Sequence, residues 1–455
     1  MSRCEAPTRT RVDHAARVDR LVTAVRDARG GATLRLRKDT SNLFRDRASN
    51  AKRALDVRDF NNVLSVDPAR GTVEAEGMVT YDELVAATLP HGVVPAVVPE
   101  LKTITLGGAA AGVGIEASSF RFGLVHETLG ELEILTGDGR VVTCRPDNEH
   151  AQLFYAFPNS YGTLGYALKL SARAIAARPF VEVTHRRFER HDEFFAALEA
   201  ACVAPNDFVD GVVFGANELY LNTGRFVDSA PYTSDYTYER IYYRSIKERD
   251  VDYLTTHGYI WRWDTDWFWC SKNVGAQNPL LRRLFGRRRL GSRTYQRLMR
   301  WNARWGITRA WNRLRSGYAE SVIQDVDVPL ERADAFLHFF QQEIRISPIW
   351  VCPIRAGADA DRFALYPLRP NKLYVNFGFW DVARRSEPHE AGYLNRQIET
   401  EVARLEGIKS LYSDSYYARD VFWKRYGGER YRALKRQYDP TGAFPDLYEK
   451  CVMRR

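Results

Sequence analysis

The chain has 455 residues, of which 45% are hydrophobic and 27% charged, and its formal net charge is +9. This length exceeds what one hydrophobic core serves, and the composition excludes an intrinsically disordered protein. The sequence contains no run of 18 apolar residues and no apolar signal-peptide core, so we expect no membrane span and no secretion. Six scattered cysteines without a C-x-x-C pair favour reduced thiols in the cytoplasm and predict no metal site.

In chain order, the first region alternates short helices, strands and hairpins. Apolar spacing predicts a first helix, and Thr80 is the expected N-cap of a second. Gly137-Asp138-Gly139 is a hairpin turn between two apolar runs. This irregular alternation favours an α+β fold over a doubly wound parallel sheet. The expected helices cover 15–29 and 81–89, and the expected strands cover 33–36, 62–66, 71–76, 131–136, 140–144 and 164–175.

The character of the sequence changes near residues 176–182. Beyond this point aromatic residues become more frequent, and charged helical stretches separate strand-like runs such as 350–354 and 373–377. We therefore predict a domain boundary here, with a first domain over 1–179 and a second over 180–425.

A glycine-rich segment at residues 99–119 is the strongest functional signal. Small residues dominate it, and hydroxyl side chains stand at both ends. A backbone without bulky side chains approaches a phosphate or flat ring closely and offers its N–H groups to anionic oxygens, so we expect a ligand here. A tight helix–sheet contact is the structural alternative. Gly112 to Ala117 also match G-x-G-x-x-A, but a loop follows where a Rossmann unit needs a helix, so we reject that interpretation.

Several blocks of sequence resemble one family of flavoenzymes. PELKTITLGGAAAGVGIEASSFRFG, ELEILTGDGRVV and DNEHAQLFYAFPNSYGTLGYALKLSARAI resemble the FAD-binding domain of the vanillyl-alcohol oxidase / p-cresol methylhydroxylase superfamily. The later blocks YYRSIKERDVDYLTTHGYIWRWDTDWFWCSKNVGAQNPLLRRLFG, SPIWVCPIR and FPDLYEKC resemble its Δ24-sterol reductase (diminuto-like) branch. The resemblance covers roughly residues 30 to 451. It implies a two-subdomain FAD-binding domain, an α+β cap domain that contacts substrate, and a return of residues 426–455 to the FAD domain.

The resemblance also implies which residues contact FAD. A polar loop would cradle the pyrophosphate, the glycine-rich segment would surround the pyrophosphate, ribityl chain and ring, and a second glycine loop would pack on the adenine side. These residues are Lys38, Thr40, Ser41 and Asn42 in the loop; Thr105, Gly107, Gly108, Gly112, Gly114, Ile115, Glu116, Ser118 and Ser119 in the segment; and Gly162, Thr163 and Gly165 in the second loop.

The mode of FAD attachment depends on one position. In many superfamily oxidases a histidine of the glycine-rich segment bonds covalently to the flavin. Glu116 stands at the matching position here, and residues 105–119 contain no histidine. We therefore expect non-covalent FAD. The resemblance further implies NAD(P)H as the electron donor.

Residues 257–269 carry four tryptophans within nine positions. In an extended segment, Trp261, Trp263, Trp267 and Trp269 would share one side and form an aromatic wall. Buried core packing is the structural alternative. An isolated C=C bond accepts hydride poorly unless it is protonated, and aromatic faces stabilise the resulting cation. The acid candidates in this cap region are Tyr243, His257, Asp264 and Asp266.

The positive charge is concentrated between Arg282 and Arg315, which contain twelve Arg and no acid. Leu298, Trp301 and Trp305 form a short helical stripe within this segment. An Arg- and Trp-rich segment suits an anionic bilayer, so we expect a peripheral protein on the inner face of the membrane. A solvated face with Arg stems over the core is the structural alternative. No nucleic-acid module accompanies the charge, and no feature specifies an oligomeric state.

Together these features predict an FAD-dependent, NAD(P)H-using oxidoreductase that reduces a C=C bond in a lipid. The excess of Arg over Lys is typical of a GC-rich bacterial genome, so a methylene-branched fatty acyl chain of a phospholipid is the first expected substrate. A Δ24-sterol is the second. The alternatives are an FAD-dependent alcohol oxidase or dehydrogenase, and a non-catalytic membrane-binding protein.

Overall fold

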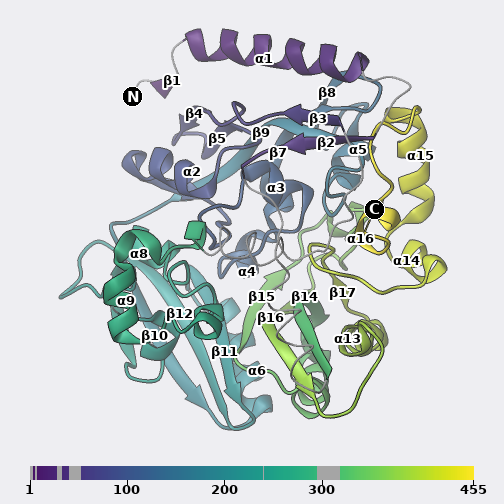
Figure 1. The fold of residues 1–455 in the computed structure, drawn as a ribbon. Coiled ribbons are helices and arrows are strands. Elements are labelled where there is room, and N and C mark those ends of the chain that lie inside the picture. The colour runs from purple at the N-terminus through teal and green to yellow at the C-terminus, as the bar shows by residue number, and fades with distance from the viewer. Residues whose placement is uncertain are drawn as a thin grey trace.

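Two large antiparallel sheets form the frame of the protein (Figure 1). The computed structural model describes residues 4–5, 8–27, 33–39, 53–238, 240–294 and 318–454. The first sheet has seven strands in the order β1-β4-β5-β9-β7-β8, with β6 paired to β9, and a separate parallel pair joins β2 and β3. The bounds are β1 Cys4–Glu5, β2 Leu34–Arg37, β3 Arg53–Asp56, β4 Val63–Asp67, β5 Thr72–Glu76, β6 Val93–Pro95, β7 Leu129–Leu135, β8 Val141–Cys144 and β9 Tyr166–Ala176.

The helices of the first half surround this sheet. In Figure 1, α1 lies across the top of the sheet, and α3 and α4 lie between the two sheets. The bounds are α1 Thr8–Arg26, α2 Tyr81–Thr88, α3 Leu106–Ala111, α4 Ser119–Phe122 and α5 Ala151–Ala156. The Thr80 cap is confirmed, because its side chain accepts from Glu83 N in a capping box. The predicted first helix begins seven residues too late, since polar residues precede its apolar stripe.

The second sheet has eight strands in the order β13-β10-β12-β11-β15-β16-β14-β17. Its side chains alternate between two environments. Val322, Val326 and Val375 pack on one face with residues of α6, α12 and α13. The opposite face points toward α3 and α4 (Figure 1). The bounds are β10 Phe180–Phe188, β11 Phe208–Gly215, β12 Glu218–Val227, β13 Val251–Thr255, β14 Tyr318–Pro329, β15 Ile349–Arg355, β16 Leu373–Arg385, β17 Ile408–Lys409, α6 His191–Val203, α12 Leu330–Phe339 and α13 Tyr393–Arg404.

The last helices return to the first sheet. They are α14 Arg419–Arg425, α15 Gly428–Tyr438 and α16 Leu447–Cys451, and α15 lies beside α5 in Figure 1. Tyr431 and Tyr438 share a buried cluster with Leu132 of β7, and Gly137 N donates to Tyr438 O over 2.8 Å. The chain therefore ends against the half in which it began, while the domain limits given above stay predictions.

The aromatic segment does not adopt the predicted extended form. α8 Thr256–Ile260 is followed by consecutive turns, and Trp267 and Trp269 have φ of 55° and 58°. Trp261 packs in the core of the first half, whereas Trp263 and Trp269 pack against the second sheet. The single aromatic wall is thus wrong, because turns rotate successive side chains into different cores.

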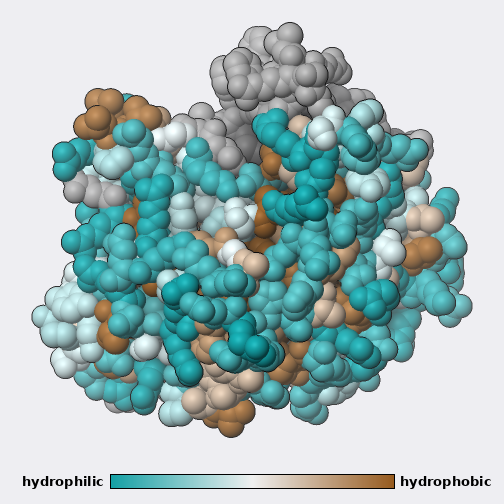
Figure 2. Space-filling view, turned by 90° about the horizontal axis from the view of Figure 1, so that it is seen from below, coloured by the Kyte–Doolittle hydropathy of each residue, from teal (hydrophilic) through white to brown (hydrophobic). Residues whose placement is uncertain are grey.

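Two further described α-helices, α7 Tyr242–Ser245 and α9 Pro279–Phe285, flank this segment in the sequence. Among the described helices, none has the length and apolarity that crossing a bilayer requires. The face seen in Figure 2 is mostly hydrophilic, with apolar residues in small separate patches. Among the described residues, Cys144, Cys202, Cys270, Cys352 and Cys451 form no disulfide.

Candidate functional site

The glycine-rich segment begins with a close helix–strand contact. Gly108 N donates to Thr105 Oγ1 over 3.1 Å, which caps α3. Gly107 N donates to Gly77 O over 2.9 Å, and a Cβ at Gly107 would lie 2.7 Å from that oxygen. A tight contact between helix and sheet, the alternative to a ligand, therefore explains Gly107, since only glycine permits this approach.

The end of α3 meets the second glycine loop. Tyr161 N donates to Ala111 O over 2.9 Å, and Asn159 N donates to Gly112 O over 3.1 Å. Gly162 and Gly165 have φ of 76° and 145°, which glycine alone adopts easily. Two segments that lie about fifty positions apart are thereby joined, while their contact with one cofactor stays a prediction.

Unsatisfied donors follow α3. Val113, Gly114 and Ile115 are partly exposed, and within the described part of the chain their N–H groups donate no hydrogen bond. The buried Ser160 Oγ in the adjacent loop also lacks one among the described atoms. Successive N–H groups beside a hydroxyl suit the oxygens of a diphosphate, so the donor set fits FAD.

The other predicted FAD contacts differ in what their side chains do. Ser118 Oγ donates to Ala96 O over 2.7 Å, Ser119 Oγ accepts from Glu116 N over 3.2 Å, and Thr163 Oγ1 donates to Ser160 O over 2.8 Å. These hydroxyls shape the loops internally. Lys38 is half-buried after β2, and Thr40, Ser41 and Asn42 lie outside the described residues.

A polar group on the second sheet faces this segment. Trp380 Nε1 donates to Tyr412 Oη over 2.9 Å, and Tyr412 hydrogen-bonds Asp325. Burial raises the pKa of Asp325 to about 7, although the hydrogen bond from Tyr412 lowers it. All three residues are only partly buried. Tyr161 also contributes to the raised pKa of Tyr412, which places this group near the second glycine loop.

An aromatic cluster adjoins the same group. Phe268 stacks on Trp263 with ring centroids 5.1 Å apart, and it lies 4.7 Å from Trp380. Ile115 of the glycine-rich segment packs against this cluster. An aromatic cluster thus stands beside the predicted flavin segment, and of the four expected tryptophans it contains Trp263 and Trp269.

The four predicted acids lie in separate environments. Tyr243 Oη donates to Gln277 Oε1 over 2.6 Å at the edge of the aromatic cluster, and Asp264 accepts from the N–H groups of Lys102 and Ser292. Burial raises the pKa of Asp264 and raises that of Asp266 to about 7. His257 is exposed, and desolvation and Lys102 lower its pKa. Their role in proton transfer stays a prediction.

A buried ion cluster joins the two halves of the protein. Arg262 pairs with Glu100, with Glu116 at 3.2 Å and with Asp210 at 2.8 Å, and its guanidinium lies 4.0 Å from the ring centroid of Tyr259. Burial raises the pKa of both glutamates although Arg262 opposes the shift, and the neighbouring Glu116 raises the pKa of Glu100 further. A cavity of about 20 Å³ beside Glu116 has room for one water and not for a substrate.

Comparison with known proteins identifies the family. Residues 10–145 match the model of the FAD binding domain family. The chain is 30% identical over 411 residues to the Delta(24)-sterol reductase of Rattus norvegicus, covering 86% of this chain and 76% of that protein. The chain belongs to the Δ24-sterol reductase family. The reductases of Homo sapiens (29% over 419 residues; 86% and 76% covered) and Arabidopsis thaliana (25% over 438 residues; 88% and 77% covered) are also similar.

As a member of the Δ24-sterol reductase family, the protein is an FAD-dependent oxidoreductase with a p-cresol methylhydroxylase-type α+β fold. Sequence interpretation missed the Arg262 cluster and the group of Asp325, Tyr412 and Trp380. One signal was available for the latter: in residues 322–328, Asp325 and Asp327 alternate with buried valines. Acids on the inward face of a strand are uncommon unless they serve a site.

Proposed function

We propose that this protein reduces a C=C bond in a lipid, with non-covalent FAD and with NAD(P)H as the electron donor. The observation that carries the proposal is the similarity to sterol reductases over 86% of the chain, which spans both the glycine-rich segment and the second sheet. The absence of histidine from residues 105–119 supports non-covalent attachment. Bound FAD, once reduced, supplies the hydride.

The preferred substrate is a methylene-branched fatty acyl chain of a phospholipid, and a Δ24-sterol is the second candidate. Protonation of either double bond gives a tertiary cation. Phe268 and Trp380 are partly exposed, and Trp263 is buried behind Phe268, on which it stacks. In this proposal the aromatic faces of Phe268 and Trp380 contact the apolar chain and stabilise positive charge.

The proton comes, in this proposal, from Asp325 through Tyr412. A carboxyl group with a pKa of about 7 is partly protonated at neutral pH and donates readily. The hydrogen bonds from Trp380 to Tyr412 and between Tyr412 and Asp325 orient the two acidic groups. Tyr243 and Asp266, which also lie near the aromatic cluster, stay alternative donors.

We further propose that α9 and the basic segment contact an anionic bilayer from the cytoplasmic side. Leu280 and Leu284 are 70% and 78% exposed on this helix, and Leu281 and Phe285 are also exposed. Adjacent exposed apolar and Arg side chains are typical of interfacial helices. Arg282 does not contribute, because it is buried and donates to Tyr238 O. Leu298, Trp301 and Trp305 lie outside the described residues.

An anaerobic titration tests the reaction. The yellow protein is reduced with NADPH and then mixed with lipids. We expect bleaching by NADPH and return of colour with a methylene-branched or Δ24-unsaturated lipid, but not with its saturated analogue. A flavin that ignores NADPH and is reduced by an alcohol would support the oxidase alternative instead, and a purified protein that takes up no FAD would support the non-catalytic one.

Vesicle binding tests the membrane contact. The double variant Leu280→Ser/Leu284→Ser should bind anionic vesicles at least about tenfold more weakly, since two side chains lose their apolar transfer energy. Val203→Ser is the matched control, because Val203 is 79% exposed on a different helix. Equal binding by all three proteins would contradict the role of α9.

A further inference from the structure

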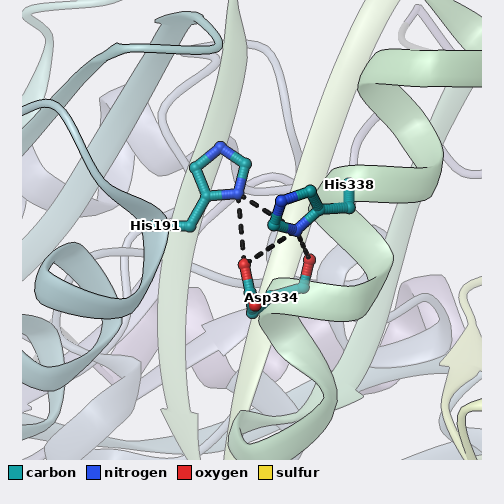
Figure 3. Close-up of side chains that lie close together, drawn as sticks. All are labelled: His191, Asp334 and His338. Atoms are coloured by element: carbon teal, nitrogen blue, oxygen red, sulfur yellow. Dashed lines mark hydrogen bonds and ion pairs between the residues drawn. The ribbon is translucent and has the colours of Figure 1, made fainter.

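Three metal-ligating side chains converge on the helical side of the second sheet. They are His191 at the start of α6 and Asp334 and His338 on α12 (Figure 3). His191 Nδ1 lies 3.1 Å from Asp334 Oδ1 and 3.3 Å from His338 Nδ1, and His338 Nδ1 lies 3.0 Å from Asp334 Oδ1. The three atoms form a nearly equilateral triangle.

Helical spacing and helix packing produce this convergence. Asp334 and His338 stand four residues apart on α12, so their side chains lie on one side of the helix. α6 packs against α12 and presents His191 to that side. Both helices cover the sheet face opposite to Asp325 and Trp380. The triangle is therefore separate from the predicted flavin site.

The triangle has the dimensions of a metal coordination face. Ligands about 2.0–2.1 Å from a tetrahedral zinc ion lie about 3.3–3.4 Å apart, and an ion equidistant from these three atoms would stand about 1 Å above their plane. His191 is buried, whereas the side chains of Asp334 and His338 are 51% and 55% exposed. Water thus has access to the remaining coordination position.

The protonation state of the two imidazoles decides what holds the triangle together. If both rings carry the proton on Nδ1, both N–H groups point to Asp334 Oδ1, and that of His338 also reaches Asp334 O at 3.1 Å. If both rings carry it on Nε2, two nitrogen lone pairs and a carboxylate oxygen converge, and a cation bound by all three removes the repulsion between them.

The surroundings of His191 also suit a ligand. Its Nδ1 faces Asp334 and His338, so Nε2 is the ring nitrogen available to the backbone carbonyl of Ala216, with which the ring hydrogen-bonds. Metal-bound histidines usually donate their second N–H to such an acceptor, which fixes the tautomer and the ring orientation.

We propose that His191, Asp334 and His338 bind one zinc ion, with water at the fourth position. Two imidazole nitrogens and one carboxylate oxygen are a donor set that zinc favours. Because the ligands come from two helices, the ion connects α6 to α12 and stabilises their packing on the second sheet. This binding does not depend on the proposed lipid reductase activity.

Zinc titration of the FAD-loaded, tag-free protein tests the site. We expect one zinc ion per chain, measured by competition with a chromophoric chelator, and a higher unfolding midpoint with zinc. In the same protein, Co²⁺ should give tetrahedral absorption bands at wavelengths longer than those of the flavin. His338→Gln and Asp334→Asn should each weaken zinc binding at least about tenfold.

His389→Gln is the matched control, because His389 lies in the same half and outside the triangle. It should bind zinc as the unmodified protein does. Each variant should retain its flavin spectrum, which shows that it is folded. If a variant fails to fold, the Co²⁺ spectrum of the unmodified protein decides. No saturable zinc binding, no tetrahedral Co²⁺ bands, or equal affinity in His338→Gln would each overturn the proposal.

Discussion

At the scale of single residues, burial decides the chemistry of Asp325. An aspartate on a surface is ionised at neutral pH, but desolvation inside this protein raises the pKa of Asp325 to about 7. The group is therefore protonated below this pH and ionised above it. A reaction that takes its proton from Asp325 should slow as the pH rises through 7.

Asp325→Asn should lower turnover about a hundredfold or more, since general acid catalysis contributes roughly that factor. Reduction of the flavin by NADPH should remain, because that step takes no proton from Asp325. Stopped-flow measurement of the two half-reactions against pH separates these effects. Asp266→Asn is the comparison, because Asp266 has a similar pKa of about 7 in a different environment. If the fall in turnover above pH 7 disappeared in Asp266→Asn but not in Asp325→Asn, Asp266 would be the proton donor instead.

At the scale of elements, α1 is fixed to the first sheet by a charged contact. His14 Nδ1 lies 2.6 Å from Glu76 Oε1 on β5, and His14 Nε2 lies 2.9 Å from Glu133 Oε1 on β7. Burial of the ring opposes its protonation, but hydrogen bonds to Glu133 and Glu76 outweigh burial and raise the pKa of His14 to about 9. The folded state therefore binds this proton more tightly than the unfolded chain does.

His14→Gln should reduce the free energy of unfolding at pH 6 by about 2 kcal/mol, after allowance for the partial exposure of the ring. The stabilisation from His14 is fully present below pH 6.5 and is lost as the pH rises through about 9. The difference between the two proteins in denaturant unfolding should thus disappear near pH 10. A difference that is constant with pH would show that His14 acts through packing alone.

Gly107 illustrates an element whose position depends on the absence of a side chain. A Cβ there would lie 2.7 Å from Gly77 O, so Gly107→Ala should displace α3, cost about 1–3 kcal/mol and lower the FAD content of the purified protein. Gly130→Ala is the control, since no atom lies within 4 Å of its Cβ position. Flavin absorbance per chain and the unfolding midpoint measure both effects. Full FAD content in Gly107→Ala would contradict the positioning of α3 by this contact.

At the scale of the whole molecule, Arg262 connects the two halves. Glu100 and Glu116 come from the first half, and Asp210 and Arg262 come from the second. Arg262→Met removes the cation and leaves buried carboxylates without compensation, which costs about 3–5 kcal/mol. We expect two separate unfolding transitions in calorimetry and easier loss of FAD.

Arg190→Met provides the reference for this prediction. Arg190 pairs with Asp192 on the surface, where both side chains are more than half exposed and water screens the charges. The unfolding profile of the Arg190→Met variant should match that of the unmodified protein. A single transition at an unchanged midpoint in Arg262→Met would show that the two halves are joined by apolar packing instead.

The sequence alone determined the features that depend on local chemistry. Thr80 caps α2, glycine-rich turns join β7 to β8, and the small residues after Thr105 allow close backbone approach, because each of these depends on neighbouring residues. The resemblance carried by the glycine-rich segment and the later blocks indicated the flavoenzyme family for the same reason.

The tertiary structure decided which distant residues meet. Asp325 contacts Tyr412, Arg262 contacts Glu116, and His191 contacts His338 only because the two sheets and their helices bring distant parts of the sequence together. In the aromatic segment, the local sequence pattern predicted the wrong backbone conformation. Its alternating pattern predicted an extended strand, but burial of Trp261 and Trp263 in two different cores favours a series of turns. Long-range packing outweighed local periodicity there, because large apolar side chains gain more from burial than the backbone loses by turning.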